Sequence, residues 1–152
     1  MKEISHLLRK AFLDVLTPFT IEGVTIPIFD NIVNPEASIP LFRGIPTYMV
    51  ILDQNENDID GNDCSYLQNA TITFDIVTKF QGNVISSLPS ELVSNQLLQT
   101  VLSLTSEQIQ ISDSNVNVLT TRKLLSRVLV DQGASLTAIR KRIIFESIVY
   151  ES

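Results

Sequence analysis

The sequence predicts an α+β domain in which two helices lie on one face of a mostly antiparallel sheet, with extended loops and an arm around them. Two segments repeat apolar residues at three- and four-residue spacing, as helices do, and two long segments alternate apolar with polar residues, as strands do. The order is helix, strands, helix, strands. With 44% hydrophobic content, residues 1–152 are expected to form a single domain with one core.

The first helix is predicted at residues 4–16, where apolar side chains share one face and charged side chains the other. Pro18 ends it, because a proline pushes the preceding residue out of the helical conformation. Two short apolar segments then flank Glu22-Gly23. Glycine supplies the positive φ that a tight hairpin needs, so a hairpin is predicted there.

The next part of the chain is expected to contain an arm and two strands. Residues 30–46 are rich in proline and lack a sustained period, which predicts an irregular arm. Residues 48–52 form a short apolar run typical of a buried strand, and residues 54–67 are expected to form a polar, acidic loop. Residues 70–80 alternate and predict a long, half-buried strand whose apolar face carries Ile72, Phe74, Ile76 and Phe80.

The second helix is predicted to start near Pro89, since proline is favoured in a first helical turn. Its buried stripe is expected to comprise Val93, Leu97, Leu98, Val101 and Leu104. After a polar loop at 112–117, residues 122–125 are compatible with helix, whereas 127–130 indicate a strand. Gly133 permits a turn into a long strand at 136–150, whose core face is expected to carry Ile139, Ile143, Phe145 and Val149.

The composition excludes several classes of protein. A formal charge of −6 argues against a free-standing nucleic-acid binder, because duplex affinity depends on neutralising phosphates with Lys and Arg. No stretch approaches the roughly 20 apolar residues that span a bilayer, and the N-terminus does not resemble a secretory signal. A soluble protein made in the cytosol is therefore expected, without contact to a membrane.

Charge is distributed unevenly along the chain. Six of the eleven basic residues fall between positions 122 and 142, and five acidic residues crowd positions 53–63. Two regions of opposite charge suit head-to-tail packing of identical subunits, although two solvated surfaces would show the same pattern. On the last strand two arginines share the outward face with Glu146. The residues predicted to contribute to a subunit interface are Asp53, Glu56, Asp58, Asp60, Arg140 and Arg142.

The residues that enzymes and metal sites need are scarce. His6, the one histidine, has no acidic residue three or four positions later, and Cys64, the one cysteine, lies in a polar loop. Residues 53–63 superficially resemble a calcium loop, but Asp58 stands where that loop needs glycine and Cys64 where it needs glutamate. The five glycines are scattered singly. No catalytic, metal or cofactor site is therefore expected.

Three stretches carry a resemblance to a known class of proteins. The first runs from the helix at 4–16 through residues 24–30 and a proline-containing arm to the strand at 48–52. The second is the strand and glycine turn at 72–82, followed by the helix that starts near Pro89. The third is the closing pair, in which residues 128–133 turn back into residues 140–145. Together they resemble the small tail-completion, tail-terminator and head–tail connector proteins of tailed bacteriophages.

The resemblance implies a structural virion protein that forms a ring of identical subunits, a hexamer or dodecamer, around the DNA channel. It would close the tail tube or join it to the head, contact other neck, portal or tail proteins, and assemble in the host cytoplasm. DNA would pass through without sequence-specific binding, and negative walls would weaken its attraction. The alternative is a non-enzymatic adaptor or binding module that docks a partner along a sheet edge.

Overall fold

The computed structural model describes residues 5–33, 37–52, 56–59, 66–81, 85–105, 107–109, 111, 116–133 and 135–151, with residues 5, 56–59, 66 and 151 described by their backbone alone. The elements in chain order are α1 (Ser5–Leu16), β1 (Phe19–Ile21), β2 (Val24–Ile26), β3 (Ile28–Asp30), β4 (Leu41–Phe42), β5 (Ile45–Leu52), β6 (Glu56–Ile59), β7 (Tyr66–Gln81), α2 (Leu88–Ser103), β8 (Val116–Gln132) and β9 (Leu136–Glu151).

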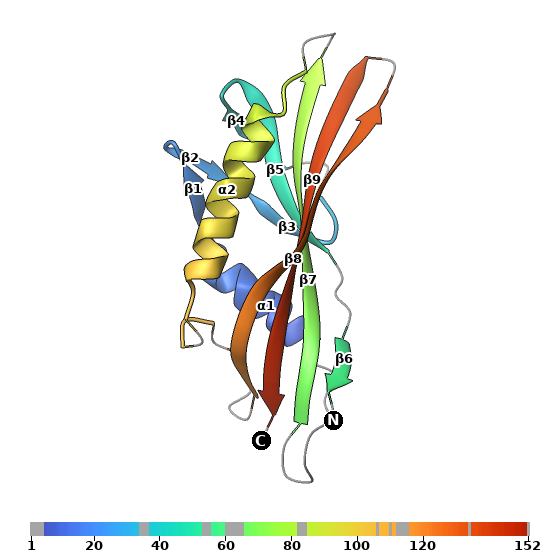
Figure 1. The fold of residues 1–152 in the computed structure, drawn as a ribbon. Coiled ribbons are helices and arrows are strands. Elements are labelled where there is room, and N and C mark those ends of the chain that lie inside the picture. Colours follow the sequence, from blue (N-terminus) through green and yellow to red (C-terminus); the bar gives the residue numbers. More distant parts are fainter. Residues whose placement is uncertain are drawn as a thin grey trace.

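The main sheet has the strand order β3-β5-β7-β9-β8, with β4 added to β5 and β6 added to β7 (Figure 1). Every pair is antiparallel except β3 with β5, which run parallel. Strands β7, β8 and β9 are unusually long, at 16, 17 and 16 residues. The chain therefore has the predicted α+β fold with a mostly antiparallel sheet.

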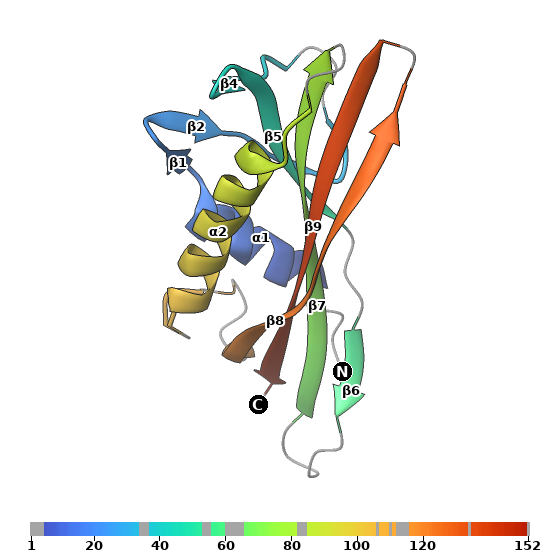
Figure 2. The same cartoon turned by 45° about the horizontal axis from the view of Figure 1, so that its top comes forward.

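Both helices lie on the same side of the sheet (Figures 1 and 2). Phe12 of α1 and Leu97 of α2 are fully buried in one apolar cluster with Ile72 and Phe74 of β7. The Phe74 and Phe145 rings meet edge to face, with centroids 5.9 Å apart. The faces predicted for both helices and both long strands are thus the ones that build the core.

A smaller cluster covers part of the opposite face of the sheet. Tyr48 and Val50 of β5 and Val77 of β7 are buried there against side chains from the arm that follows β3. The Phe29 and Tyr48 rings meet edge to face at 5.8 Å, and Lys79 Nζ lies 5.5 Å from the centre of the Tyr48 ring. The second face is therefore partly apolar near β5 and becomes polar toward β9.

The predicted irregular arm ends earlier than expected. A second tight hairpin, centred on Arg43-Gly44, joins β4 to β5, and both of its central residues have positive φ, at 51° and 79°. The Glu22-Gly23 turn of the first hairpin has the same character, with φ of 49° and 77°. Two strand residues before Arg43-Gly44 were too few to show an alternation, which is why the sequence pattern missed this turn.

The predicted loop at 54–67 contains the short strand β6, and its residues 54–55 and 60–65 lie outside the described part of the chain. Strand β5 pairs with β7 only from Thr73 to Thr78, so the same edge of β7 near its start is open to another strand. Glu56–Ile59 pairs there with residues 67–70. Residues 56–59 have little strand propensity of their own. They form a strand because the start of β7 offers backbone groups that would otherwise lack hydrogen-bond partners.

The helical alternative for residues 122–125 is wrong, because these residues belong to the continuous strand β8. Strand β9 offers a full ladder of backbone partners along its whole length, and β8 follows it. The register shifts between Val118 and Thr120 and again between Lys123 and Leu125. Each shift inverts the alternation of side chains, which hides the strand period in the sequence.

Candidate assembly surface

Strand β8 forms one edge of the main sheet. It pairs with β9 on one side, and no strand in the described part of the chain pairs with its other side. Only its first residues are covered, since Val116 and Val118 are buried in the core cluster. The end of the β8–β9 hairpin stands apart from both helices (Figures 1 and 2). A long row of backbone N–H and C=O groups is therefore open to another strand.

The exposed residues of β8 include large aliphatic side chains. The solvent-exposed fractions lie between 42% and 53% for Leu119, Leu124, Leu125, Val128 and Val130. Leu136, at the start of β9, is also exposed. Single exposed apolar residues are common, but a run of them along an open sheet edge is typical of a surface that another chain covers.

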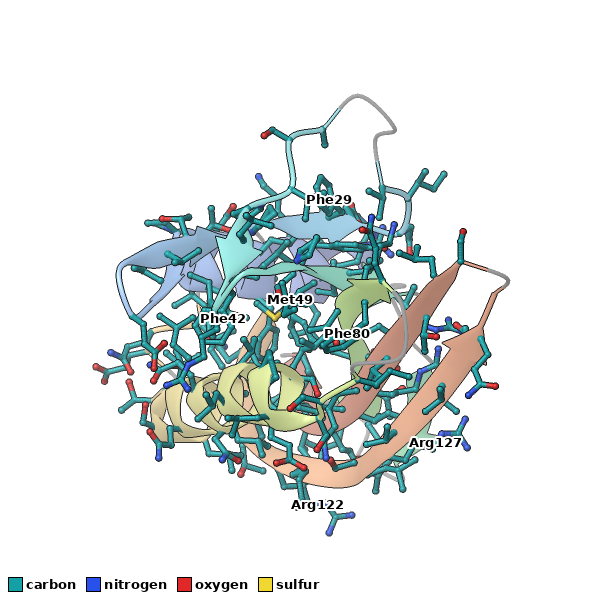
Figure 3. All side chains as sticks on the ribbon, turned by 90° about the horizontal axis from the view of Figure 1, so that it is seen from above. Phe29, Phe42, Met49, Phe80, Arg122 and Arg127 are labelled. Atoms are coloured by element: carbon teal, nitrogen blue, oxygen red, sulfur yellow. The ribbon has the colours of Figure 1, made fainter. Side chains whose placement is uncertain are left out.

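Basic side chains are interleaved with these aliphatic residues. Figure 3 shows Arg122 and Arg127 pointing away from the molecule, whereas Phe42, Met49 and Phe80 point into its interior. Arg122 binds Glu146 of β9, with Nε and Nη2 at 2.9 and 2.7 Å from one carboxylate oxygen. Lys123 and Arg127 form no ion pair with any residue that the structure describes. The edge is therefore both apolar and positively charged.

Arg140 and Arg142, predicted at a subunit interface, lie on the face of β9 opposite the core, as expected. Arg142 donates two hydrogen bonds to Asp75 of β7, at 2.8 and 2.9 Å, and these bonds raise the pKa of the arginine. Arg140 forms two ion pairs, with Nη1 at 3.8 Å from Asp75 Oδ2 and Nε at 2.8 Å from Asp131 Oδ2. The contact of Nε with Asp131 does not have the geometry of a hydrogen bond. Both arginines are thus engaged within the subunit, and their contact with a neighbour stays a prediction.

The acidic residues predicted at the interface are only partly described. Asp53 and Asp60 lie outside the described residues, as do Asp63 and Cys64. Glu56 and Asp58 belong to β6, which pairs with the side of β7 that faces away from β9. The order of strands in this half of the sheet is therefore β6-β7-β9-β8, and the acidic and basic segments stand at opposite edges.

Asp75 is the residue of this surface that sequence reasoning missed as a partner. Asp75 lies on the face of β7 opposite the apolar residues Phe74 and Ile76, yet it is only 3% exposed. The register of β7 against β9 brings Asp75 opposite Arg142. Because a buried carboxylate needs a positively charged partner, the single acidic residue of this long strand, between Phe74 and Ile76, was a signal that one of the arginines would bind it.

A cleft of about 580 Å³ opens at the end of the sheet where β4, β5, β7 and β9 meet. Leu41, Pro46, Phe80 and Leu136 contribute to its lining. Its lining includes one charged side chain, Lys79, and no carboxylate, imidazole or thiol. The cleft therefore has no pair of groups suited to acid–base chemistry, and its walls suit an aliphatic side chain.

His6 is exposed on α1, as expected for a surface histidine. Among the described residues, no three His, Cys, Asp or Glu side chains are grouped closely enough to hold a metal ion. No helix in the described part of the chain is long and apolar enough to cross a membrane.

The chain was compared with known proteins. No protein-family model matches it, and no curated protein matches its sequence.

Proposed function

We propose that this chain is a structural, non-enzymatic virion protein that forms a ring around the DNA channel at the neck or tail end of a tailed bacteriophage. The observation that supports this most is the edge strand β8, which pairs on one side only within the described part of the chain and carries exposed aliphatic residues and cations. The resemblance of three sequence stretches to tail-completion, tail-terminator and head–tail connector proteins gives the location.

A ring, rather than a two-fold dimer, follows from the two edges of the sheet being different. One edge is the long, basic strand β8, and the other is formed by the short strands β3 and β6. Unlike edges favour head-to-tail contacts, which close into a ring when the rotation between neighbours divides a full turn. We propose six or twelve copies, in contact with portal, neck or tail proteins of the same virion.

The net charge supports a passive channel. A net formal charge of −6 on each subunit gives an assembled ring a strongly negative potential. A duplex moving past such walls is not gripped through its phosphates. Sequence-specific DNA binding is not part of this function.

The second candidate function is an adaptor that binds a partner strand along β8. The same open edge supports it, since strand addition supplies backbone hydrogen bonds to any extended segment. The two functions differ in the oligomer. A ring subunit forms a discrete hexamer or dodecamer, alone or on a tail or connector, whereas an adaptor stays small and needs a non-phage partner.

The test is electron microscopy of the particles made when the gene for this chain is deleted from its phage genome. The proposal predicts that filled heads and tails fail to join, or that tails have irregular ends, and that the gene supplied in trans restores whole particles. Intact virions from the deletion strain would contradict the proposal.

A further inference from the structure

The inference made here rests on the proposed function and concerns how neighbouring subunits meet. We propose that β8 of one copy pairs in antiparallel fashion with β6 of the next copy, so that the sheets of all subunits join into one sheet around the ring. The occupant of the open β8 edge is therefore a second copy of this chain.

The strand directions fit this contact. Strand β7 is antiparallel to both β6 and β9, and β9 is antiparallel to β8, so β6 and β8 run in opposite directions within one subunit. Figure 1 shows the same relation in the arrowheads of the two strands. Rotation about an axis along the strands preserves these directions. It therefore brings β8 of one copy beside β6 of the next as an antiparallel pair, like most pairs in the sheet.

The two edge strands also overlap in their position along the strand direction. Glu56 of β6 pairs with Ala70, Ala70 with Ser147, and Ser147 with Thr121 of β8. Subunits of a closed ring stay at one height, so Glu56 of one copy approaches Thr121 of the next. The cations Arg122 and Lys123 come directly after Thr121 in β8.

Charge favours this contact over self-pairing of β8. Strand β8 carries Arg122, Lys123 and Arg127 against a single acidic residue, Asp131, whereas β6 carries Glu56 and Asp58. Two copies of β8 related by a two-fold axis would place like charges opposite each other, which destabilises a strand pair. Pairing β8 with β6 at this level instead makes position 56 of one copy the diagonal neighbour of Lys123 in the next, so that an acidic residue stands beside a basic one.

Exposed aliphatic residues explain why the contact would be stable as well as specific. Leu119 and Leu124 lie beside the proposed contact and are about half exposed in the isolated subunit. Burying such side chains removes apolar area from water, and pairing the open edge satisfies its backbone groups.

The test uses two complementary charge reversals. One variant, Lys123→Glu, reverses the cation of β8 that lies nearest to position 56 of the next copy, and the other, Glu56→Lys, reverses the acidic residue of β6 at that position. Neither variant alone should form a ring at a concentration at which the wild-type chain does. An equimolar mixture should recover the ring with the two variants alternating, because every junction then joins opposite charges. Native mass spectrometry distinguishes the species by mass.

The controls separate this contact from other effects. Lys10→Glu, on the exposed face of α1, reverses a charge away from both edges and should leave the ring unchanged. Melting curves of each variant confirm that the monomers fold. The mixture has the average charge of the wild type, so recovery there excludes a simple effect of net charge.

Three results would overturn the inference. If the β6 reversal assembles normally while the β8 variant pairs with the wild-type chain, the contact is a β8 self-pair. If all variants form rings, neither edge is used, and the proposed function stands without this contact. If the wild-type chain stays monomeric at every concentration and ionic strength, both the inference and self-assembly by this subunit are wrong.

Discussion

At the scale of single residues, the polar cluster on the second sheet face is built around the buried carboxylate of Asp75. Arg142 binds both of its oxygens, and Arg140 bridges it to Asp131 of β8. This cluster ties β7, β9 and β8 together on the sheet face opposite the helices. A buried carboxylate without its arginine would be costly, so the cluster also fixes the register of the strands.

Replacing Arg142 by methionine is therefore expected to lower the free energy of unfolding by about 2 kcal/mol, because Asp75 keeps only its distant contact with Arg140. Arg122→Met is the matched control. Arg122 also binds a carboxylate on β9, but its side chain is 69% exposed, and such surface pairs contribute at most about 1 kcal/mol. Chemical denaturation measures both values. Equal losses in the two variants would show that the Asp75 pair contributes no more than a surface pair.

Tyr48 gives a pH-dependent prediction. Burial raises the pKa of its hydroxyl, against a smaller opposing effect of Arg140, so the pKa is higher in the folded than in the unfolded chain. This contribution to stability is complete below the ordinary tyrosine pKa of about 10 and is lost as the pH rises through the folded-state pKa.

The free energy of unfolding should therefore fall more steeply above pH 10 in the wild-type chain than in Tyr48→Phe, which keeps the ring contacts with Phe29 and Lys79. Tyr150→Phe, at a half-buried position, serves as the control. Denaturant melts at several alkaline pH values measure the difference. Parallel pH profiles for the wild type and Tyr48→Phe would contradict the prediction.

Residue types and faces were largely predictable from the sequence, but partners were not. Ile143 and Phe145 point into the core and Arg140 and Arg142 away from it, as the period of two requires. The bond between Asp75 and Arg142 depends on the register of two strands 67 positions apart in sequence, and no local pattern sets that register.

At the scale of elements, the helices were predicted well because their period is local and uninterrupted. Strand β8 was harder, because two shifts of register invert its alternation and place Leu124 and Leu125 side by side as exposed residues. Strand β6 was missed because it forms to cover part of β7, not through a propensity of its own. Irregularities of this kind gather at the edges of the sheet, where the proposed contacts between subunits lie.

The packing of the two helices predicts two sensitive positions. Phe12 of α1 and Leu97 of α2 are completely buried in the same cluster. Replacing either by alanine should lower the free energy of unfolding by about 2–5 kcal/mol, since each leaves a cavity in a close-packed core. Leu102→Ala, on the exposed side of α2, is the control and should have little effect. Unchanged melting temperatures for Phe12→Ala and Leu97→Ala would refute this packing.

At the scale of the whole molecule, the subunit presents two different sheet edges and an uneven distribution of charge. The covered face of the sheet provides the stability of the fold, and the open edge β8 provides a surface for association. The sequence indicated the opposite charges of the two segments. It did not show that they stand at opposite edges of one sheet, because that placement depends on the order of the long strands.

The measurement that tests the central claim most directly is the native mass of the wild-type chain across a range of concentrations at low ionic strength. Contacts between acidic and basic edges are strongest there, since salt screens exposed charges. The account predicts one discrete species of six or twelve copies of the 17.0-kDa chain, replacing the monomer as concentration rises. A monomer or a two-fold dimer as the largest species at every concentration would contradict assembly of the ring through the subunit's own edges.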